Sequence, residues 1–423
     1  MPLTRPSTGL ILTGGGARAA YQVGVLQAVA QIKRDAGVNG NPFDIIAGTS
    51  AGAINAASLA CGADRFDDAV DALFRLWSQL RVERVYRADA LGVVRTGTRW
   101  MTMMSLGWAI RRWRKSQPKS LLDNSPLREL LQSSLNLERL PRLLAAGKLR
   151  ALAISGSSYS SGQHVTFYQS AQPIAPWLRS QRIAVPAQLT VDHLMASSAI
   201  PFIFPAQALD LGGHEEWFGD GSMRQSAPIS PAVHLGAQRV LVIGAGRMQE
   251  AGERAKLTEG HPSMAQIAGH ALSNIFLDAL AVDIERLQRI NKTLTLLPEH
   301  ARMATPLRPV EVLVISPSRR LDELAGNHQH ELPQSIRALL GAIGVEGHGR
   351  QASGSALSSY LLFMPGYTTE LITLGMTDTL ARRADVTRFF GWDAAKKPEP
   401  VWERLRRQGF LRDAQPVPEA ANS

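Results

Sequence analysis

One serine of this chain lies in a setting typical of a nucleophile. The segment Gly48–Gly52 reads GTSAG and matches the pattern G-x-S-x-G, with Ser50 at its centre. In that pattern a sharp turn between a strand and a helix exposes the hydroxyl, and small neighbours permit the strained backbone. We interpret Ser50 as the candidate nucleophile of an acyl-transfer site. A tight turn without chemistry is the alternative, but the apolar run before the segment and the alanine-rich stretch after it favour the elbow.

A second glycine-rich turn, made of Gly14, Gly15 and Gly16, lies earlier in the chain. It also stands between a strand-like run and a helical pattern, where backbone N–H groups can converge on an anion. Acyl transfer requires such donors because the tetrahedral intermediate carries negative charge on oxygen. Losing one preorganised donor raises the barrier by about 3–4 kcal/mol. Arg18, just beyond the glycines, is expected to reinforce the positive potential.

The same glycines allow a second interpretation. Gly14, Gly16 and Ala19 fit the pattern G-x-G-x-x-A of a dinucleotide-binding turn, and Asp35 or Asp44 lies roughly where a ribose-binding carboxylate is expected. A lone match of this kind is weak, and it leaves the serine elbow unexplained.

The group that would accept the serine proton is not fixed by these two turns. All ten histidines follow residue 163, so the chain order serine, acid, histidine is available, with His214 as one candidate base. In ordinary α/β-hydrolases the elbow follows several strands, whereas here it follows the second predicted strand. A histidine-dependent serine esterase stays open as an alternative.

The elements that must position these turns are predicted from short apolar runs. Residues 9–13 and 43–47 read as buried strands, and each is followed by a glycine turn and a helix, over about 17–33 and through about residue 60. This repeated unit favours parallel pairing and an α/β core. Further strands are predicted at 149–154, 202–204, 240–243 and 310–315, and long helices at 262–291 and 368–383.

Four segments together resemble the pattern of the patatin-like phospholipase family. They are the glycine turn at 14–18, the elbow at 48–52, the block at 196–205 (ASSAIPFIFP) and the Asp-Gly pair at 220–221. The resemblance covers residues 9–231, a little over half of the chain. It departs from the family at Ala19, where many members have glycine, and at Ser222, where glycine or alanine is usual.

The resemblance implies an α/β protein with a three-layer α/β/α patatin-like fold and a mainly parallel central sheet. It also implies hydrolysis of fatty acyl esters in lipids, of the phospholipase A, lysophospholipase or lipid esterase type, without a cofactor or metal. Carried over by position, Ser50 is the nucleophile and Asp220 is its base without a histidine. Residues 14–16 then form the oxyanion loop, with Arg18 beside it.

A dyad of this kind requires a desolvated carboxylate. Burial raises the pKa of a carboxyl group and makes it a better base for a hydroxyl proton. Trp217 and Phe218, immediately before Asp220, are expected to supply an apolar wall. An aspartate in an ordinary Asp-Gly turn is the alternative.

Positive charge is concentrated in one stretch of the chain. Lys plus Arg exceed Asp plus Glu by 46 − 36 = 10, and residues 81–119 hold ten basic and two acidic residues with tryptophans and methionines between them. This mixture suits an anionic lipid interface, although a solvated basic helix or an acidic partner fits it too. We predict a lid or a peripheral membrane anchor, and no nucleic-acid binding.

Compartment and domain organisation follow from coarser features. The single cysteine, Cys61, excludes an intrachain disulfide and fits a reducing compartment. With neither a signal-like start nor a run of about 18 apolar residues, we expect a cytoplasmic protein, peripheral on the inner face of the membrane when bound. We predict a catalytic core at 9–231 with a basic aromatic insertion at about 81–119, an extension at 232–395 packed on the same domain, and a mostly disordered tail at 396–423. The sequence does not predict an oligomeric state.

Overall fold

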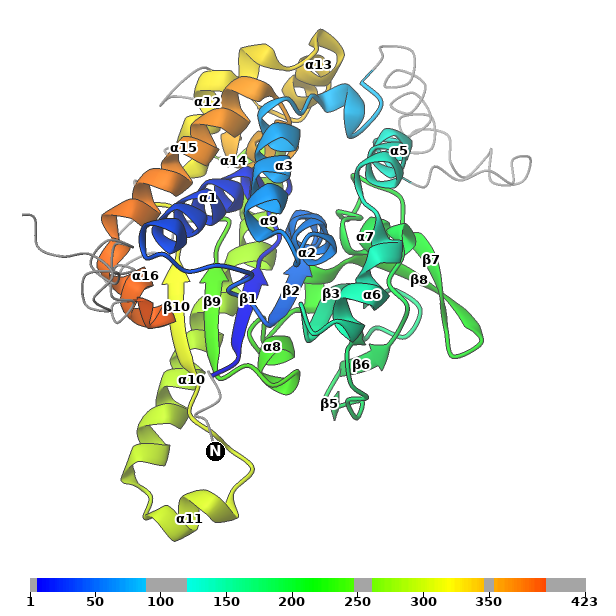
Figure 1. Cartoon of the computed structure of the whole chain (residues 1–423). Helices are drawn as coiled ribbons and strands as arrows, with labels where there is room; N and C mark the ends of the chain where they lie inside the picture. Colours follow the sequence, from blue (N-terminus) through cyan, green and yellow to red (C-terminus); the bar gives the residue numbers. More distant parts are fainter. Residues whose placement is uncertain (1–5, 89–119, 247–260, 346–353, 393–423) are drawn as a thin grey trace, which may run out of the picture.

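The computed structural model of the chain describes residues 6–88, 120–246, 261–345 and 354–392. Its centre is a 10-stranded sheet with the path β10-β9-β1-β2-β3-β4-β6-β5, in which β8 also pairs with β3, and β7 pairs with β8 (Figure 1). The strands are β1 (Thr8–Leu12), β2 (Ile45–Thr49), β3 (Ala151–Ser158), β4 (His164–Ser170), β5 (Leu178–Arg179), β6 (Arg182–Pro186), β7 (Gln207–Leu211), β8 (His214–Asp220), β9 (Arg239–Ile243) and β10 (Glu311–Ile315).

One half of the sheet is parallel. Strands β10, β9, β1, β2 and β3 all run in the same direction. Every residue of β1, β2 and β3 is buried, as expected for parallel strands that are covered on both faces. β4 and β8 then pair antiparallel with β3. The predicted mainly parallel sheet is confirmed.

Helices and short helical turns connect these strands. The longer ones are α1 (Ala20–Asp35), α2 (Ala51–Cys61), α3 (Phe66–Ser78), α5 (Ser125–Ser134), α6 (Leu140–Ala145), α7 (Val191–Ser197), α8 (Ser230–His234), α9 (Met264–Ser273), α10 (Ala279–Leu296), α11 (Glu299–Ala304), α12 (Leu321–His328), α13 (Gln334–Ala342), α14 (Ser355–Leu361), α15 (Pro365–Ala381) and α16 (Arg383–Phe390). The short turns are η1 (Gly16–Ala19), η2 (Val82–Arg84), η3 (Leu137–Arg139), η4 (Gly221–Arg224), η5 (Asn274–Asp278) and η6 (Gln329–Glu331).

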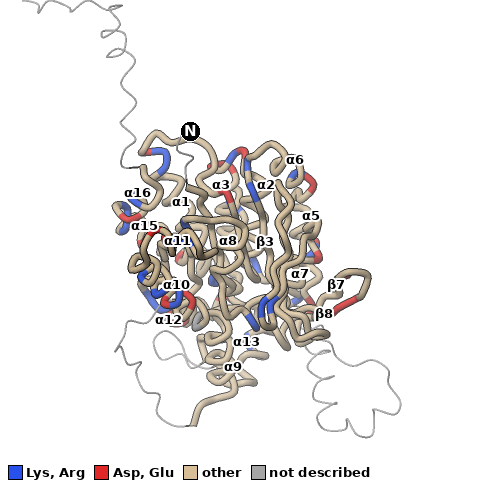
Figure 2. The backbone as a smooth tube through the Cα atoms, turned by 90° about the horizontal axis from the view of Figure 1, so that it is seen from below, with Lys and Arg blue, Asp and Glu red and all other residues tan. Residues whose placement is uncertain are grey.

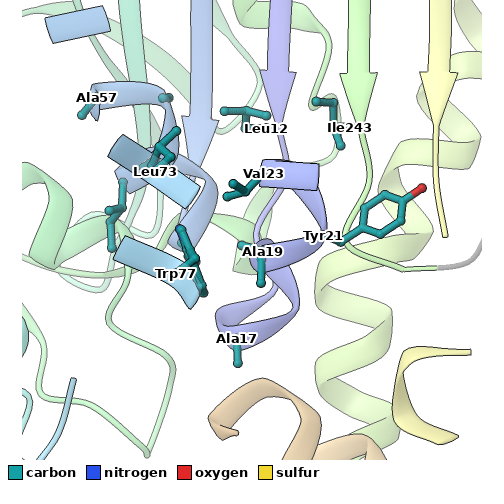
Figure 3. Close-up of a cluster of buried hydrophobic side chains, with 14 of the residues drawn as sticks. Leu12, Ala17, Ala19, Tyr21, Val23, Ala57, Leu73, Trp77 and Ile243 are labelled. Atoms are coloured by element: carbon teal, nitrogen blue, oxygen red, sulfur yellow. The ribbon is translucent and has the colours of Figure 1, made fainter. Parts of the chain in front are cut away.

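Two apolar clusters lie on opposite faces of the sheet. Leu10 and Leu12 of β1 belong to one cluster, together with residues of α1, α2, α3 and α15, whereas Ile11 belongs to the other, together with residues of α8 and α10. Successive strand residues point to opposite faces, so the sheet lies between two helical layers (Figure 1). The three-layer α/β/α fold is therefore confirmed. Figure 3 shows part of the first cluster, where Leu12 lies near Val23 of α1.

The region after residue 233 extends the same sheet. β9 pairs with β1, and β10 pairs with β9. α15 lies directly against α1, since a Cβ atom on Gly24 would stand 1.9 Å from the Ile372 carbonyl oxygen. The division into a core and an extension near residue 231 stays a prediction, but both parts share one sheet.

One predicted strand is wrong. Residues 202–204 form a turn in which Phe202 has a φ of 65° and is 78% exposed. Pro201 and Pro205 bracket this short apolar run, and proline cannot donate to a strand ladder. The turn is joined instead to the chain after residue 119, because the Leu121 N–H donates to the Phe202 carbonyl over 2.9 Å.

One helical stretch, Met264–Leu296, is long and apolar enough to cross a membrane by length and composition alone, although no run of consecutive apolar residues marks it in the sequence. Its most apolar window is 38% buried inside the protein. Core helices of globular proteins meet the same criterion, so this helix is weak support for a membrane span.

Two predicted segments lie largely or wholly outside the described residues. They are the basic aromatic insertion, of which only residues 81–88 are described, and the tail at 396–423. Their predicted roles stay predictions. In the described chain, Lys and Arg are distributed over several elements, among them α10 and α16 (Figure 2).

Candidate active site

Ser50 lies between the end of β2 and the start of α2. Its φ and ψ are 56° and −131°, a conformation that is strained for a residue with a side chain. Gly52 permits the turn because a Cβ atom there would lie 2.3 Å from the Leu12 carbonyl oxygen. Likewise, a Cβ atom on Gly48 would lie 2.4 Å from the Gly52 oxygen. Close backbone contacts therefore require both elbow glycines.

Asp220 reaches Ser50 although 170 positions separate them in the chain. β8 pairs with β3 so that Asp220 lies opposite Gly156, and β3 is the neighbour of β2, which leads into Ser50. The Ser50 hydroxyl donates to Asp220 Oδ2 over 2.5 Å. The Ser222 N–H donates to Oδ1 over 2.9 Å. The structure thus brings the two predicted dyad residues together and holds both carboxylate oxygens.

Burial shapes the chemistry of the Asp220 carboxyl group, whose exposed fraction is 0%. Burial raises its pKa to about 6, and the interactions with Ser50 and with the N–H and hydroxyl of Ser222 lower it in part. Phe218 is fully buried on the same face of β8 as Asp220, since the two residues are two positions apart. Trp217 points the other way and is 43% exposed, so the expected apolar wall includes Phe218 and not Trp217.

The turn after β1 supplies unpaired backbone donors. In the described chain, the amides of Gly14, Gly15 and Gly16 form no hydrogen bond within the protein, and the same holds for Ala51, the first residue of α2. Gly16 lines the same pocket as Ser50. These amides are the donors that the arrangement offers to a developing oxyanion.

Arg18 contacts α14 rather than the pocket. Its buried guanidinium donates from Nε to Ser359 Oγ over 2.8 Å and lies 4.0 Å from the centroid of the Tyr360 ring. Arg18 is not among the residues that line the pocket around Ser50. The structure therefore places it as a brace between the glycine turn and α14.

A buried hydrogen-bond chain joins the glycine turn to α2 and α3. Asn55 donates to the Ala19 carbonyl over 3.3 Å and to Gln22 over 2.9 Å, and Gln22 donates to the Thr13 carbonyl over 2.7 Å. Asn55 also accepts the indole N–H of Trp77 over 2.8 Å. Buried polar groups need such partners, so this chain fixes both ends of the glycine turn relative to the helix that follows Ser50.

An apolar pocket lies against Ser50. It encloses about 620 Å³ of space free of protein atoms, and this space includes open solvent. Apolar side chains make most of its wall, including Ile54, Trp77, Leu80, Leu131, Phe204 and Phe363. Trp77 also belongs to the buried cluster of Figure 3. The pocket suits an acyl chain better than a polar ligand.

The histidine alternative has no support from the described geometry. Apart from His348, which lies outside the described residues, no histidine is hydrogen bonded to the side chain of Ser50 or Asp220. His214 is exposed at the start of β8, whereas Asp220 stands at the end of that strand.

The dinucleotide alternative also lacks its carboxylate. Asp44 accepts the Thr8 N–H over 2.8 Å at the start of β1, opposite the glycine turn, and Asp35 pairs with Arg383 over 2.8 Å. Among the described residues no group of three or more His, Cys, Asp or Glu side chains is placed to hold a metal ion.

Sequence reasoning missed two serines at this site. Ser197 ends α7, and its buried Oγ accepts the Ser50 N–H over 2.8 Å. Ser198 lines the pocket beside Ser50, and its buried Oγ has no hydrogen-bond partner in the described chain. The only signal for a role was their place in the block at 196–205.

Comparison with known families identifies the family of this chain. A model described as patatin-like phospholipase matches residues 10–233, just over half of the chain. The chain belongs to the patatin-like phospholipase family. The family predicted from the four motifs is confirmed.

Individual relatives in this comparison are distant or partial. Lysophospholipase nte1 of Aspergillus terreus is 52% identical over 58 residues, which cover 14% of this chain and 3% of that protein. Of the solved structures, VipD from Legionella pneumophila has a TM-score of 0.31 at 12% identity, and the match covers 87% of this chain and 67% of the VipD chain. Human GIVD cytosolic phospholipase A2 has a TM-score of 0.36 at 10% identity, covering 92% and 63%. These scores are low, so membership rests on the family model.

Proposed function

We propose that this protein hydrolyses fatty acyl esters of lipids through an acyl-enzyme on Ser50, with Asp220 as the base. The observation that carries the proposal is the 2.5 Å hydrogen bond between the Ser50 hydroxyl and the buried Asp220 carboxylate on the wall of an apolar pocket. Family membership supports a lipid ester as the substrate.

The proposed reaction proceeds in two halves. Asp220 first accepts the hydroxyl proton as Ser50 Oγ attacks the ester carbonyl carbon, and the amides at residues 14–16 stabilise the oxyanion. The ester C–O bond then breaks, and Asp220 returns the proton to the leaving alkoxide. In the second half, water gives a proton to Asp220 as its oxygen attacks the acyl carbon. The bond from Ser50 Oγ to the acyl carbon then breaks, and Asp220 returns the proton to Oγ, which releases the fatty acid and restores Ser50.

The environment of Asp220 supports its role as base. Its pKa of about 6 leaves it mostly ionised at pH 7 and brings its basicity closer to that pH than an exposed aspartate would be. Ser50 is held toward it by strained backbone and by the hydrogen bond of its own N–H to Ser197.

Contact with an anionic membrane through residues 81–119, and a cytoplasmic location, remain part of the proposal. The chain enters that segment directly after Leu80, which lines the pocket, and Leu127 of α5 lines it again after the segment. Both flanks of the segment therefore belong to the wall of the pocket, which supports a lid or an interfacial anchor there.

Labelling with a fluorophosphonate probe tests the nucleophile. We expect the native protein to label and to release fatty acid from a panel of lipids, and Ser50→Ala to do neither. Ser58→Ala, on the same helix and outside the pocket lining, is the matched control and should behave as the native protein. A native protein that does not label would favour a non-catalytic membrane-associated scaffold with the same fold. Loss of labelling in His214→Ala would favour the histidine-dependent esterase.

A further inference from the structure

We propose that a second pocket, which begins at the residue two positions after Asp220, binds a phosphate group. Its walls come from η4 and the residues after it, from the turn between β5 and β6, and from η5. The lining is polar and basic, and includes Arg182, Ser222, Arg224, Gln225, Ser226 and Asn274. This pocket shares no lining residue with the apolar pocket around Ser50.

The two arginines of this pocket have no carboxylate partner among the described residues. In the described chain Arg182 and Arg224 form no ion pair and no side-chain hydrogen bond, and Arg142 on α6 likewise forms no ion pair. Arg182 is half-buried and Arg224 is exposed. Guanidinium groups that line a concave polar site and remain unpaired are suited to bind the oxygens of a phosphate in a bidentate manner.

The positive charge of Arg182 lowers the pKa of neighbouring groups. The pKa of His164 falls to about 4, first because of burial and then because of Arg182. The pKa of His234 is also lowered, by burial first and then by Arg179 and Arg182. Asp283, a carboxylate near enough to be affected by Arg182, is buried and accepts the Ile229 N–H over 3.0 Å. The positive charge of Arg182 is therefore available to a ligand.

Neutral donors complete the pocket. Ser222 is buried, and its hydroxyl lies close enough to the Asp220 carboxylate to lower the pKa of that group. It therefore places a neutral donor between this pocket and the dyad. Gln181 holds a φ of 57° in the two-residue turn between β5 and β6, and this turn positions Arg182 at the pocket.

The pocket is also directly coupled to the catalytic dyad. The Ser222 N–H donates to Asp220 over 2.9 Å, and the Gln225 amide donates to the hydroxyl of Thr49, next to Ser50, over 3.0 Å. A phosphate has two sources here, the headgroup of a phospholipid or the free anion. Binding itself is independent of the proposed hydrolysis, whereas the headgroup source rests on it.

Calorimetric titration of the full chain tests the pocket. Ser50→Ala protein, which does not turn over lipid, is titrated with inorganic phosphate and with glycerophosphocholine. Arg182→Gln/Arg224→Gln on this background should weaken binding by about 10-fold or more, the usual effect of losing charge-assisted hydrogen bonds. Arg142→Gln on α6, exposed and outside both pockets, is the matched control and should bind as the parent does. The exposed Arg224→Gln alone keeps the test valid when the double variant unfolds.

Three outcomes decide the proposal. The headgroup is identified by two results together. Glycerophosphocholine binds in an arginine-dependent manner, and the double variant that retains Ser50 loses kcat/KM for a phospholipid but not for a neutral glyceride of the same chain length. Arginine-dependent binding of inorganic phosphate alone identifies the free anion. Absence of binding, or binding that the arginine variants leave unchanged, overturns the proposal. Because titration needs no turnover, this failure is distinct from a failure of the hydrolase proposal.

Discussion

The two glycine turns at the ends of β1 and β2 differ in what holds them. The elbow after β2 is held by the family-matched half of the chain, since Gly52 packs on the Leu12 carbonyl and the Ser50 N–H donates to Ser197. The turn after β1 is held by the same half, since Gln22 and Asn55 bond its ends, but it also packs on residues beyond 233. A Cβ atom on Gly16 would lie 2.2 Å from the Tyr360 carbonyl oxygen, and one on Gly14 would lie 2.4 Å from Ser222 Oγ and 2.8 Å from the Phe276 ring.

This difference separates the positioning of the nucleophile from the positioning of the oxyanion donors. The hydrogen bonds of Ser50 lie within the family-matched half, whereas the donors also contact α14 and η5, with Arg18 as the brace between the turn and α14. The region after residue 233 is therefore expected to affect the rate of acyl transfer as well as stability.

The largest expected effect comes from the elbow side, in Asp220→Asn. Removing the base should lower turnover by about 1,000-fold or more. Burial raises the pKa of Asp220 from 3.8 to about 6, so the stabilising contribution of the carboxyl group is greatest below the unfolded value and is lost as the pH rises through 6. At pH 7 the variant should therefore gain on the order of 1–3 kcal/mol in the free energy of unfolding.

Denaturant unfolding at pH 4 and pH 7, alongside lipid turnover, checks both parts of this prediction. The gain in unfolding free energy should shrink at pH 4, where the native carboxyl group is protonated. A gain of equal size at both pH values would mean that ionisation of Asp220 is not its cause.

The other turn is tested by Gly16→Ala. A Cβ atom there meets the Tyr360 carbonyl and a φ of 54°, so the donors should move and turnover should fall by about 100-fold. Gly147→Ala is the matched control, because Gly147 has a similar φ of 65° but no atom within 4 Å of the added Cβ. Both variants carry the backbone strain, and only the first should lose activity. An equal loss of turnover in both variants would mean that contact with Tyr360 does not position the oxyanion donors.

The smallest expected effect is on the pH dependence of kcat/KM, which also compares the two turns. Ionised Asp220 is the active form, so kcat/KM should fall as the pH drops through about 6 and should be about 10-fold lower at pH 5 than at pH 7. In Gly16→Ala the rate should be lower at every pH while the midpoint stays near that of the native protein. A shifted midpoint would show that the two turns are coupled through Asp220.

Local patterns predicted much of this arrangement. The run at 240–243 coincides with β9, and the two strand, glycine and helix units coincide with β1 to α1 and β2 to α2. These features depend on residues that are close in the chain, such as small residues at a strained turn or an apolar run buried on two faces. The proximity of Asp220 to Ser50 was expected only through the family resemblance, and its catalytic role remains a prediction.

Features set by distant partners were not predictable. The direction of Arg18 depends on Ser359, which lies 341 positions away, and the role of Ser197 depends on Ser50, 147 positions away. β8 reads HEEWFGD and is half polar, because it is an antiparallel strand with one exposed end, so apolar runs do not mark it. Once β8 is known to be a strand through Asp220, alternation shows that Phe218 rather than Trp217 shares a face with Asp220.

The burial of Ser50, which is 1% exposed, has a consequence for how a lipid would arrive. Moving a methylene group from hydrocarbon into water costs about 0.8 kcal/mol, so a long chain that left its bilayer through water would face a barrier that grows with each carbon. The walls formed by Trp77, Leu131 and Phe363 offer a second hydrocarbon-like medium. A chain that slides straight from one medium to the other avoids that barrier, so turnover would follow the area of lipid aggregate touched and not the concentration of dissolved monomer.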